Sequence, residues 1–377
     1  MSLCGLAVVL AVGLAGPLLA VPHRARLPVV VGEILLGVLV GRTGFGWVRA
    51  GDPVLSFLAS AGFALVMLVA GSHVPLRHPA LRVALRRGAL LAGFVGVLAV
   101  PTGLGVASVF DTGHGALYAV LFASSSAALV MPTLAESGTE SDATIAMVVQ
   151  VAIADTVCIV ALPLAEDTAR AGRVALGMLA VLGAGAVLLV LRQQARGRGW
   201  LARVHRVSKR RNFGLELRFE LIALFGLAGL AQVVGVSVML AGFASGLALA
   251  VQGEPRRLAR QLFGVADGFL APVFYVWLGA SVDLRVLVDQ PRMIGLAVLL
   301  ALGAVVAHAA ARLLGQPLPL AVLAGAQLGV PVAAVTIGEA GHLLMPGEGG
   351  AILAAALVSV MITGVAGSVV RPAPAEK

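Results

Sequence analysis

Apolar runs of about 20 residues recur along the whole chain and alternate with short polar or basic connections. A helix of about 20 apolar residues spans the hydrocarbon core of a bilayer, so each run predicts a membrane-spanning helix. The pattern therefore predicts an all-α polytopic membrane protein with about 13 transmembrane helices. The expected spans are 3–21, 28–42, 54–72, 87–109, 114–135, 143–165, 173–192, 213–233, 235–252, 261–281, 291–313, 318–341 and 349–370.

The connections between the runs predict how the helices are oriented. When the N-terminus is placed outside, most of the 27 basic residues fall in inner connections, as the positive-inside rule requires. The longest basic connection, 192–218, follows the span 173–192 and leaves six spans on each side of that helix. This layout predicts two inverted six-helix repeats joined by a linker helix. The C-terminus, with a short tail at 372–377, is then cytoplasmic, and the protein lies in the cell (plasma or inner) membrane.

Composition supports this picture and excludes several classes. Of the 377 residues, 59% are hydrophobic and only 12% are charged, whereas soluble domains have about 25% charged residues. The net charge of +9 comes from basic residues in the short connections, which face lipid headgroups. We therefore expect the lipid bilayer as a partner, and no nucleic acid. Cys4 and Cys158 form neither a metal-ligand spacing nor a disulfide framework.

One carboxylate, Asp155, lies in the middle of the apolar segment Val148–Leu162. A charge at the centre of a membrane helix costs about 2.5–3.5 kcal/mol on insertion scales. Glu216 and Glu220 lie at a helix start beside Arg218, and the remaining acids within spans lie nearer the span ends, where a structural pairing is expected: Glu33, Asp267 and Glu339. We therefore interpret Asp155 as the functional residue.

Two spans contain residues that interrupt a helix. Ser124, Ser125 and Ser126 precede Pro132 in the fifth span; serines compete for backbone hydrogen bonds and proline removes one. An interrupted membrane helix exposes carbonyls and helix ends that can coordinate a cation. The alternative is close helix packing through small residues.

The twelfth span carries a similar interruption, at the corresponding position of the second half. Here the residues are Gln327, Gly329 and Pro331. Paired interruptions in the two halves of a transporter indicate a binding site near the midplane. With Asp155, they predict one site formed by two broken helices.

Five segments occur in the order that is typical of one transporter family: 28–46, 63–71, 124–129, 153–160 and 272–284. The second segment reads Phe-Ala-Leu-Val-Met-Leu-Val-Ala-Gly, and the fourth, Ile-Ala-Asp-Thr-Val-Cys-Ile-Val, carries Asp155. In these segments the chain resembles the monovalent cation:proton antiporters, with sodium/hydrogen exchanger-like membrane domains, and it is most similar to the bacterial Na⁺/H⁺ and K⁺/H⁺ branch.

The resemblance implies a fold and a site. It implies a dimerisation part at about 1–75 and 213–282 and a mobile core at about 84–170 and 291–371, with the two broken helices crossing in the core and the chain forming a homodimer. The implied ion- and proton-binding residues are Asp155, Thr156, Ser125 and Ser126.

Three positions depart from the family pattern. Ala154 stands where members usually have Asp, Asn or Gln, and Gly303 lies near the position where many have Lys or Arg. Val330-Pro331 stands where many relatives of the potassium branch have Gly-Glu. The nearest basic residue to Gly303 is His308, a possible proton relay.

These observations predict a secondary transporter that exchanges Na⁺ or K⁺ for protons by alternating access at Asp155. A single carboxylate holds a proton or a cation but not both, so the exchange is expected to be electroneutral. The alternative is a non-exchanging descendant, a cation or proton channel or a sensor. No zinc or catalytic motif indicates an enzyme, and no cofactor or resident metal is expected.

Overall fold

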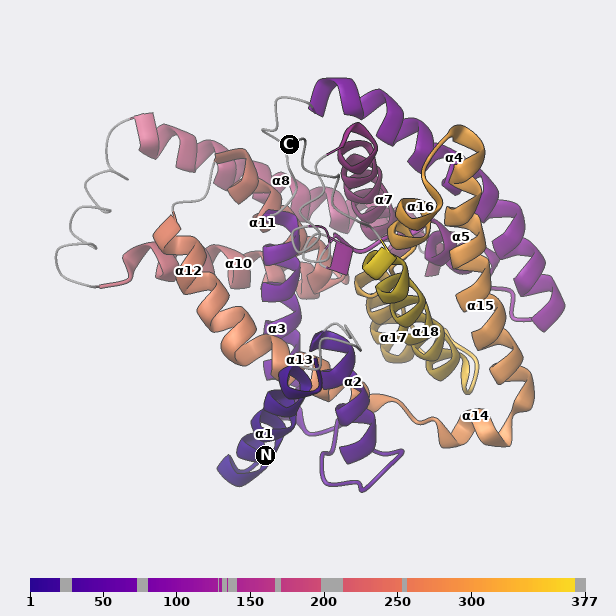
Figure 1. Ribbon diagram of the computed structural model, residues 1–377. Coiled ribbons are helices and arrows are strands. Elements are labelled where there is room, and N and C mark those ends of the chain that lie inside the picture. The colour runs from indigo at the N-terminus through magenta and orange to yellow at the C-terminus, as the bar shows by residue number, and fades with distance from the viewer. Residues whose placement is uncertain are drawn as a thin grey trace, which may run out of the picture. The chain divides into compact units, whose positions relative to one another are not determined.

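The structure is a computed structural model that describes residues 1–20, 29–72, 81–127, 129–130, 134, 141–166, 171–197, 213–252 and 256–369. All regular elements in these residues are helices (Figure 1). Eight of the described helices are long and apolar enough to cross a membrane, and three shorter apolar helices accompany them. The predicted all-α polytopic fold is confirmed, whereas the count of 13 spans and the inverted repeats remain predictions.

The chain divides into two compact units. The first unit consists of Met1–Ser56, Arg77–Ala171 and Tyr275–Lys377, and the second of Phe57–Leu76 and Gly172–Phe274. The division into dimerisation and core parts remains a prediction.

The first unit contains the two predicted interruptions and Asp155. Its helices are α1 (Leu3–Ala20), α2 (Val29–Val40), α4 (Leu81–Phe110), α5 (Gly115–Ala123), α7 (Asp142–Glu166), α14 (Arg285–Asp289), α15 (Pro291–Ala309), α16 (Leu318–Ala324), α17 (Gly329–Ala340) and α18 (Glu348–Val369), with most of α13 (Ala271–Ser281).

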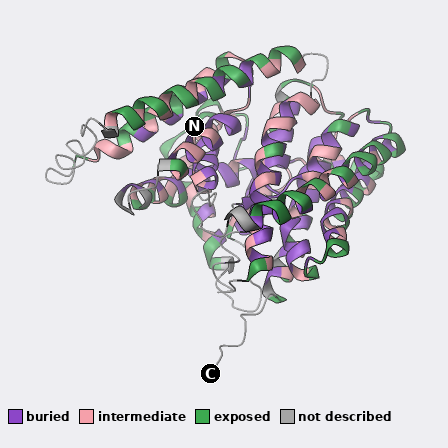
Figure 2. Ribbon diagram, turned by 90° about the horizontal axis from the view of Figure 1, so that it is seen from above, coloured by how far each residue is buried: buried purple, intermediate pink, exposed green. Residues whose placement is uncertain are grey.

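Burial differs strongly between the helices of the first unit. In α4 only 22% of the apolar window is buried, whereas 61% is buried in α7 and 78% in the window that covers α16 and α17. Exposed apolar residues of α4 include Val97, Leu104 and Val109, which suits a helix that faces lipid. Asp155 and the second interruption therefore lie on the most buried of these helices. Figure 2 colours the described residues by burial, from purple for buried to green for exposed.

The second unit packs its helices closely through glycines. It contains most of α3 (Pro53–Ser72), with α8 (Ala171–Gly197), α10 (Leu215–Val233), α11 (Val238–Gln252) and α12 (Arg256–Val265). Gly242 and Gly246 of α11 form a Gly-x-x-x-Gly pair against the backbone of α3. A Cβ atom on Gly242 would lie 2.5 Å from the Ala64 carbonyl oxygen, so only glycine fits there.

The second unit contains two acidic residues within predicted spans, Glu220 and Asp267. Glu220 is buried in α10 and forms a two-fold ion pair with Arg192 of α8, at 3.0 Å for each nitrogen–oxygen contact. Asp267 lies in a π-helical turn, Ala266–Leu270, and its side chain is exposed. The turn joins α12 to α13, so the tenth predicted span is one continuous helical segment with a local change of winding.

Candidate functional site

The first predicted interruption is a real break in the helix. α5 ends at Ala123, and Ser124 has an extended conformation with ψ 151°. A new helical turn then begins at Ala127, in which the amides of Leu129 and Val130 donate to the Ser126 carbonyl at 3.2 and 3.0 Å. All three serines at the break, Ser124, Ser125 and Ser126, are buried.

The second interruption lies between α16 and α17, at residues 325–328. Pro331 is the third residue of α17, in the first turn, where a backbone amide has no partner within its helix. Pro331 therefore lies at the beginning of the second half-helix and does not itself break the span. Gly329 is the first residue of that half-helix.

Hydrogen bonds join the two breaks. The Ser125 hydroxyl donates to the carbonyl of Ala324, the last residue of α16, at 2.6 Å. In the other direction, the Gln327 amide donates to the carbonyls of Leu121 and Ser124, the latter at 3.2 Å. Each break thus satisfies polar groups that the other break has released, which a bilayer interior requires.

The two hydrogen-bonded breaks, at 124–126 and 325–328, are called the crossing below. Asp155 lies on α7 beside this crossing. Its side chain is buried, with 6% of the residue exposed, and its Oδ2 accepts the backbone amide of Ala127 at 3.3 Å. That amide belongs to the first residue of the helical turn that follows the break. Among the described residues, no ion pair to Asp155 occurs within 4.0 Å.

Thr156 differs from the other predicted ligands. Its hydroxyl donates to the Ala152 carbonyl of its own helix at 2.7 Å, and the residue is partly exposed. Adjacent helical positions are about 100° apart around the axis, so Asp155 and Thr156 face different sides of α7. Pro132 lies outside the described residues.

His308, the possible proton relay, reaches the crossing from α15. It is fully buried; its Nε2 lies 3.3 Å from the Ser125 Oγ, and its Nδ1 lies 3.0 Å from the Ala304 carbonyl. The Phe122 ring fills the space beside Gly303, since a Cβ atom at position 303 would lie 2.6 Å from this ring. A long basic side chain at 303 therefore needs a different packing of Phe122.

Several groups near the site were not identified from the sequence. The carbonyls of Leu121 and Ala324 and the amide of Ala127 are backbone groups that any residue type provides. Gln316, just before α16, donates through Nε2 to the Oε1 of Gln150 on α7 at 2.8 Å, and both are buried. Gln150, a polar residue within the apolar run of α7, could have indicated this pair from the sequence.

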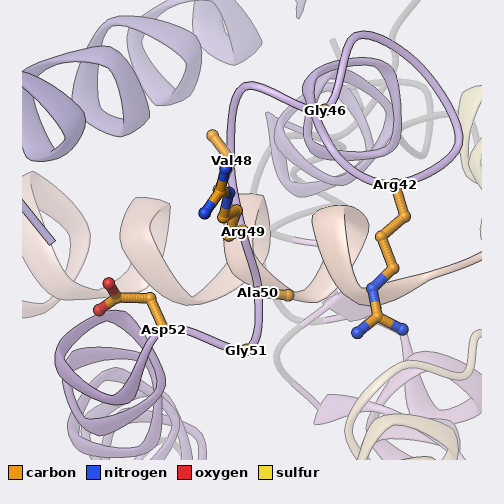
Figure 3. Close-up of a pocket in the computed structure, with 7 residues that line it drawn as sticks. All are labelled: Arg42, Gly46, Val48, Arg49, Ala50, Gly51 and Asp52. Atoms are coloured by element: carbon orange, nitrogen blue, oxygen red, sulfur yellow. The ribbon is translucent and has the colours of Figure 1, made fainter.

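A cavity elsewhere in the first unit has none of the features of the crossing. It has a volume of about 440 Å³ and is lined by the connection between α2 and α3. Arg42, Arg49 and Asp52 line it but do not converge on one point (Figure 3). Asp52 accepts bonds from the amides of Val54 and Leu55 and so caps α3, which gives it a structural role.

Comparison with known families decides the class of the protein. The family model described as "Sodium/hydrogen exchanger, transmembrane" matches residues 7–373. The chain belongs to the sodium/hydrogen exchanger family. Its family and fold are those of membrane transporters.

Individual relatives of this exchanger-family chain agree with that assignment. YjbQ of Bacillus subtilis (strain 168) is 24% identical over 96% of this chain and 62% of its own length. The Na(+)/H(+)-K(+) antiporter GerN of Bacillus cereus is 23% identical over 69% of this chain and 66% of its own. The glutathione-regulated potassium-efflux system protein KefC of Enterobacter sp. (strain 638) is 27% identical over 74% of this chain. The match covers 45% of KefC, so the chain spans about half to two thirds of these relatives.

A solved structure shows the same fold. The sodium proton antiporter MjNhaP1 from Methanocaldococcus jannaschii, determined at pH 8, superposes with a TM-score of 0.62. The superposition covers 96% of this chain and 95% of that one, at 16% identity. The exchanger-family assignment and the fold therefore agree over nearly the whole chain.

Proposed function

We propose that this chain exchanges a monovalent cation, Na⁺ or K⁺, for protons across the cell membrane by alternating access at Asp155. The observation that carries the proposal is the position of Asp155, buried beside two broken helices that are hydrogen-bonded to each other. The family membership supports the class of reaction. The N-terminus outside, the cytoplasmic C-terminus and a homodimer with separate dimerisation and core parts belong to the same proposal.

The charge of Asp155 explains why exchange is favoured at this site. A buried carboxylate with one amide donor is poorly compensated, and burial of an uncompensated charge is costly. Either a proton or a monovalent cation neutralises the side chain, and each excludes the other. Competition for one carboxylate therefore couples the two fluxes, provided that the site opens to one side at a time.

The cation requires oxygen ligands, as hard cations do. Ser125 and Ser126 supply such oxygens at the first break, with the Asp155 carboxylate on the adjacent helix. Gln327 bonds the second break to the first, and Gly329 and Pro331 lie in the first turn of the half-helix that follows it. Thr156 belongs to the set only if α7 rotates or its hydroxyl leaves Ala152, so its contribution is expected to be smaller.

The substitution Asp155→Asn tests the site in proteoliposomes that contain a pH-sensitive dye. An imposed Na⁺ or K⁺ gradient is expected to drive proton movement in the wild type and none in the variant. Asp289→Asn, at an exposed position at the end of α14, is the matched control and retains the wild-type rate. Proton movement in Asp155→Asn at the wild-type rate contradicts the assignment.

The stoichiometry has a separate test. One carboxylate predicts one proton per monovalent cation, so an imposed membrane potential leaves the rate unchanged. A rate that follows the potential overturns electroneutral exchange. A proton flux that needs no counter-moving cation favours the alternative, a cation or proton channel.

A further inference from the structure

Within the first unit, the chain that leads into α14 is fastened to the end of α2. A Cβ atom added to Gly37 or Gly279 would collide with the backbone of the other helix, so α2 and α13 lie in direct backbone contact. The Thr43 hydroxyl, just beyond α2, donates to the Val282 carbonyl at 2.8 Å and accepts the Leu284 amide at 3.0 Å. The chain is therefore fixed relative to α2 as far as Leu284.

The chain beyond this point packs against other helices of the same unit. α14 lies against α15 and α18, and its buried Leu287 is the neighbour of Gly350 in the first turn of α18. In the division proposed above, α2 and α13 belong to the dimerisation part, whereas α15 and α18 belong to the mobile core. The joint between the two parts therefore lies at residues 283–285, where one set of contacts ends and the other begins.

One side chain reaches back across this joint. Arg285 is the first residue of α14, and its side chain is exposed. Its Nε donates to the Thr43 carbonyl at 3.3 Å and its Nη2 donates to the Gly44 carbonyl at 3.4 Å. Among the described residues Arg285 forms no ion pair within 4.0 Å, so these two carbonyls are the partners of its guanidinium group. The fixed fork of donors on arginine suits such a two-point attachment.

Two other arginines bind carbonyls at helix ends, but each does so within the proposed core. Arg292 of α15 donates to the Val109 carbonyl in the last turn of α4 at 3.2 Å, and Arg87 of α4 donates to the Gly315 carbonyl at 3.1 Å. Both bonds join segments that are proposed to move as one body. Of the three arginines, only Arg285 holds carbonyls that lie on the other side of the joint, so its bonds break when the core moves away.

We infer that Arg285 is a positioning residue for transport, whose bonds to the Thr43 and Gly44 carbonyls hold the core in the position seen in the structure and whose release limits the rate of exchange. This inference rests on the proposed function. Arg285 does not touch Asp155 or the crossing, so cation binding does not depend on it. Solvent-exposed hydrogen bonds are exchanged for bonds to water at little net cost, which suits a contact that is made and broken in every cycle.

The test measures cation-driven proton movement by Arg285→Met in proteoliposomes. Methionine keeps an apolar side chain but has no donor. The maximal rate of exchange is expected to rise several-fold, with the apparent affinity for the cation nearly unchanged. Arg285→Lys, which keeps one charged donor group, is expected to have an intermediate rate. Arg292→Met is the matched control, because it removes an arginine–carbonyl bond within the core, and it keeps the wild-type rate.

The outcomes separate the inference from the proposed function. A maximal rate of Arg285→Met at or below the wild-type rate overturns the inference, and so does an equal rise in Arg292→Met. Absence of exchange in the wild type overturns the proposed function instead.

A second measurement follows the movement itself and needs no transport. Spin labels at Trp47 and Asp289, both exposed, lie on opposite sides of the joint, whereas labels at Val109 and Asp289 lie on the core side alone. The two native cysteines are first replaced by serine. Arg285→Met is expected to enlarge a second distance population between 47 and 289 and to leave the distance between 109 and 289 unchanged. Identical 47–289 distributions in the wild type and in Arg285→Met overturn the inference, whether or not the protein exchanges ions.

Discussion

The crossing of the two breaks and the α3–α11 contact show two different ways of bringing helix backbones together. In the second unit, Gly242 and Gly246 allow α11 to lie directly on the α3 backbone while both helices remain intact. In the first unit, both spans are interrupted, and Ser125 and Gln327 bond to carbonyls released by the other break.

This difference explains where transport chemistry is possible. An intact helix satisfies its own backbone groups, so glycine packing leaves no polar group free to bind an ion. A broken helix leaves amides and carbonyls that take partners from outside, and such partners can be exchanged for a cation. The glycine contact is thus suited to a fixed support and the crossing to a changing site.

The largest expected effect comes from disrupting the glycine contact between α3 and α11. In Gly242→Val, the added side chain collides with the Ala64 carbonyl, and a rigid backbone cannot give way. Most of the folded protein is expected to be lost, measured as the monodisperse yield after purification. Gly229→Val in α10, where nothing lies within 4 Å of an added Cβ, keeps the wild-type yield. Equal yields of the two variants refute the view that close backbone contact holds α3 and α11.

The next effect separates function from folding at the crossing. Gln327→Leu removes the donor to the Leu121 and Ser124 carbonyls. Interhelical hydrogen bonds in membranes contribute about 0.6 kcal/mol on average, and at most about 1.7 kcal/mol, so the protein still assembles. Exchange is expected to fall about tenfold, because the two breaks lose their relative position. Gln232→Leu, at an exposed site in α10, is the control, and a large drop there as well removes the significance of the result.

A smaller effect is expected from Ser125→Ala. The hydroxyl bonds to Ala324 and lies beside His308, but Asp155 and the remaining bonds between the breaks persist. The apparent affinity for the cation is expected to fall several-fold with the maximal rate nearly unchanged. Ser359→Ala, which removes a buried hydroxyl bonded only within α18, leaves both parameters unchanged. An unchanged affinity in Ser125→Ala excludes Ser125 as a ligand.

The sequence indicated where the two helices are interrupted, but it did not indicate which groups form the hydrogen bonds between the two breaks. A lone carboxylate in an apolar run is rare and visible, so Asp155 and the two interruptions were identified. The donors and acceptors that join the breaks include the Leu121 and Ala324 carbonyls, which belong to apolar residues and carry no signal. Thr156 shows the limit of sequence proximity, because its hydroxyl, although next to Asp155 in sequence, donates to the Ala152 carbonyl of its own helix; its role as a ligand stays a prediction.

The complete burial of Glu348, the first residue of α18, was missed for a related reason. It follows a Met-Pro-Gly turn, so its position in sequence indicates a connection. Only the three-dimensional arrangement shows that Tyr118 and His114, more than 200 residues earlier, enclose it. Long-range partners decide whether an acid at a helix end is solvated or buried, and neither hydropathy nor spacing records them.

The smallest expected effect tests whether burial of polar groups is enough to mark a functional site. Gln150 and Gln316 share one hydrogen bond, but the Nε2 of Gln150 and the Oε1 of Gln316 have no partner among the residues that the structure describes. Gln150→Leu leaves Gln316 unpaired, which costs about 1–3 kcal/mol, whereas replacing both by leucine removes the unpaired groups together. The double variant is therefore expected to unfold at a higher temperature than either single variant and to exchange at the wild-type rate. A double variant that folds but does not exchange shows instead that this amide pair belongs with the crossing, and that the polar path through the first unit extends beyond Asp155.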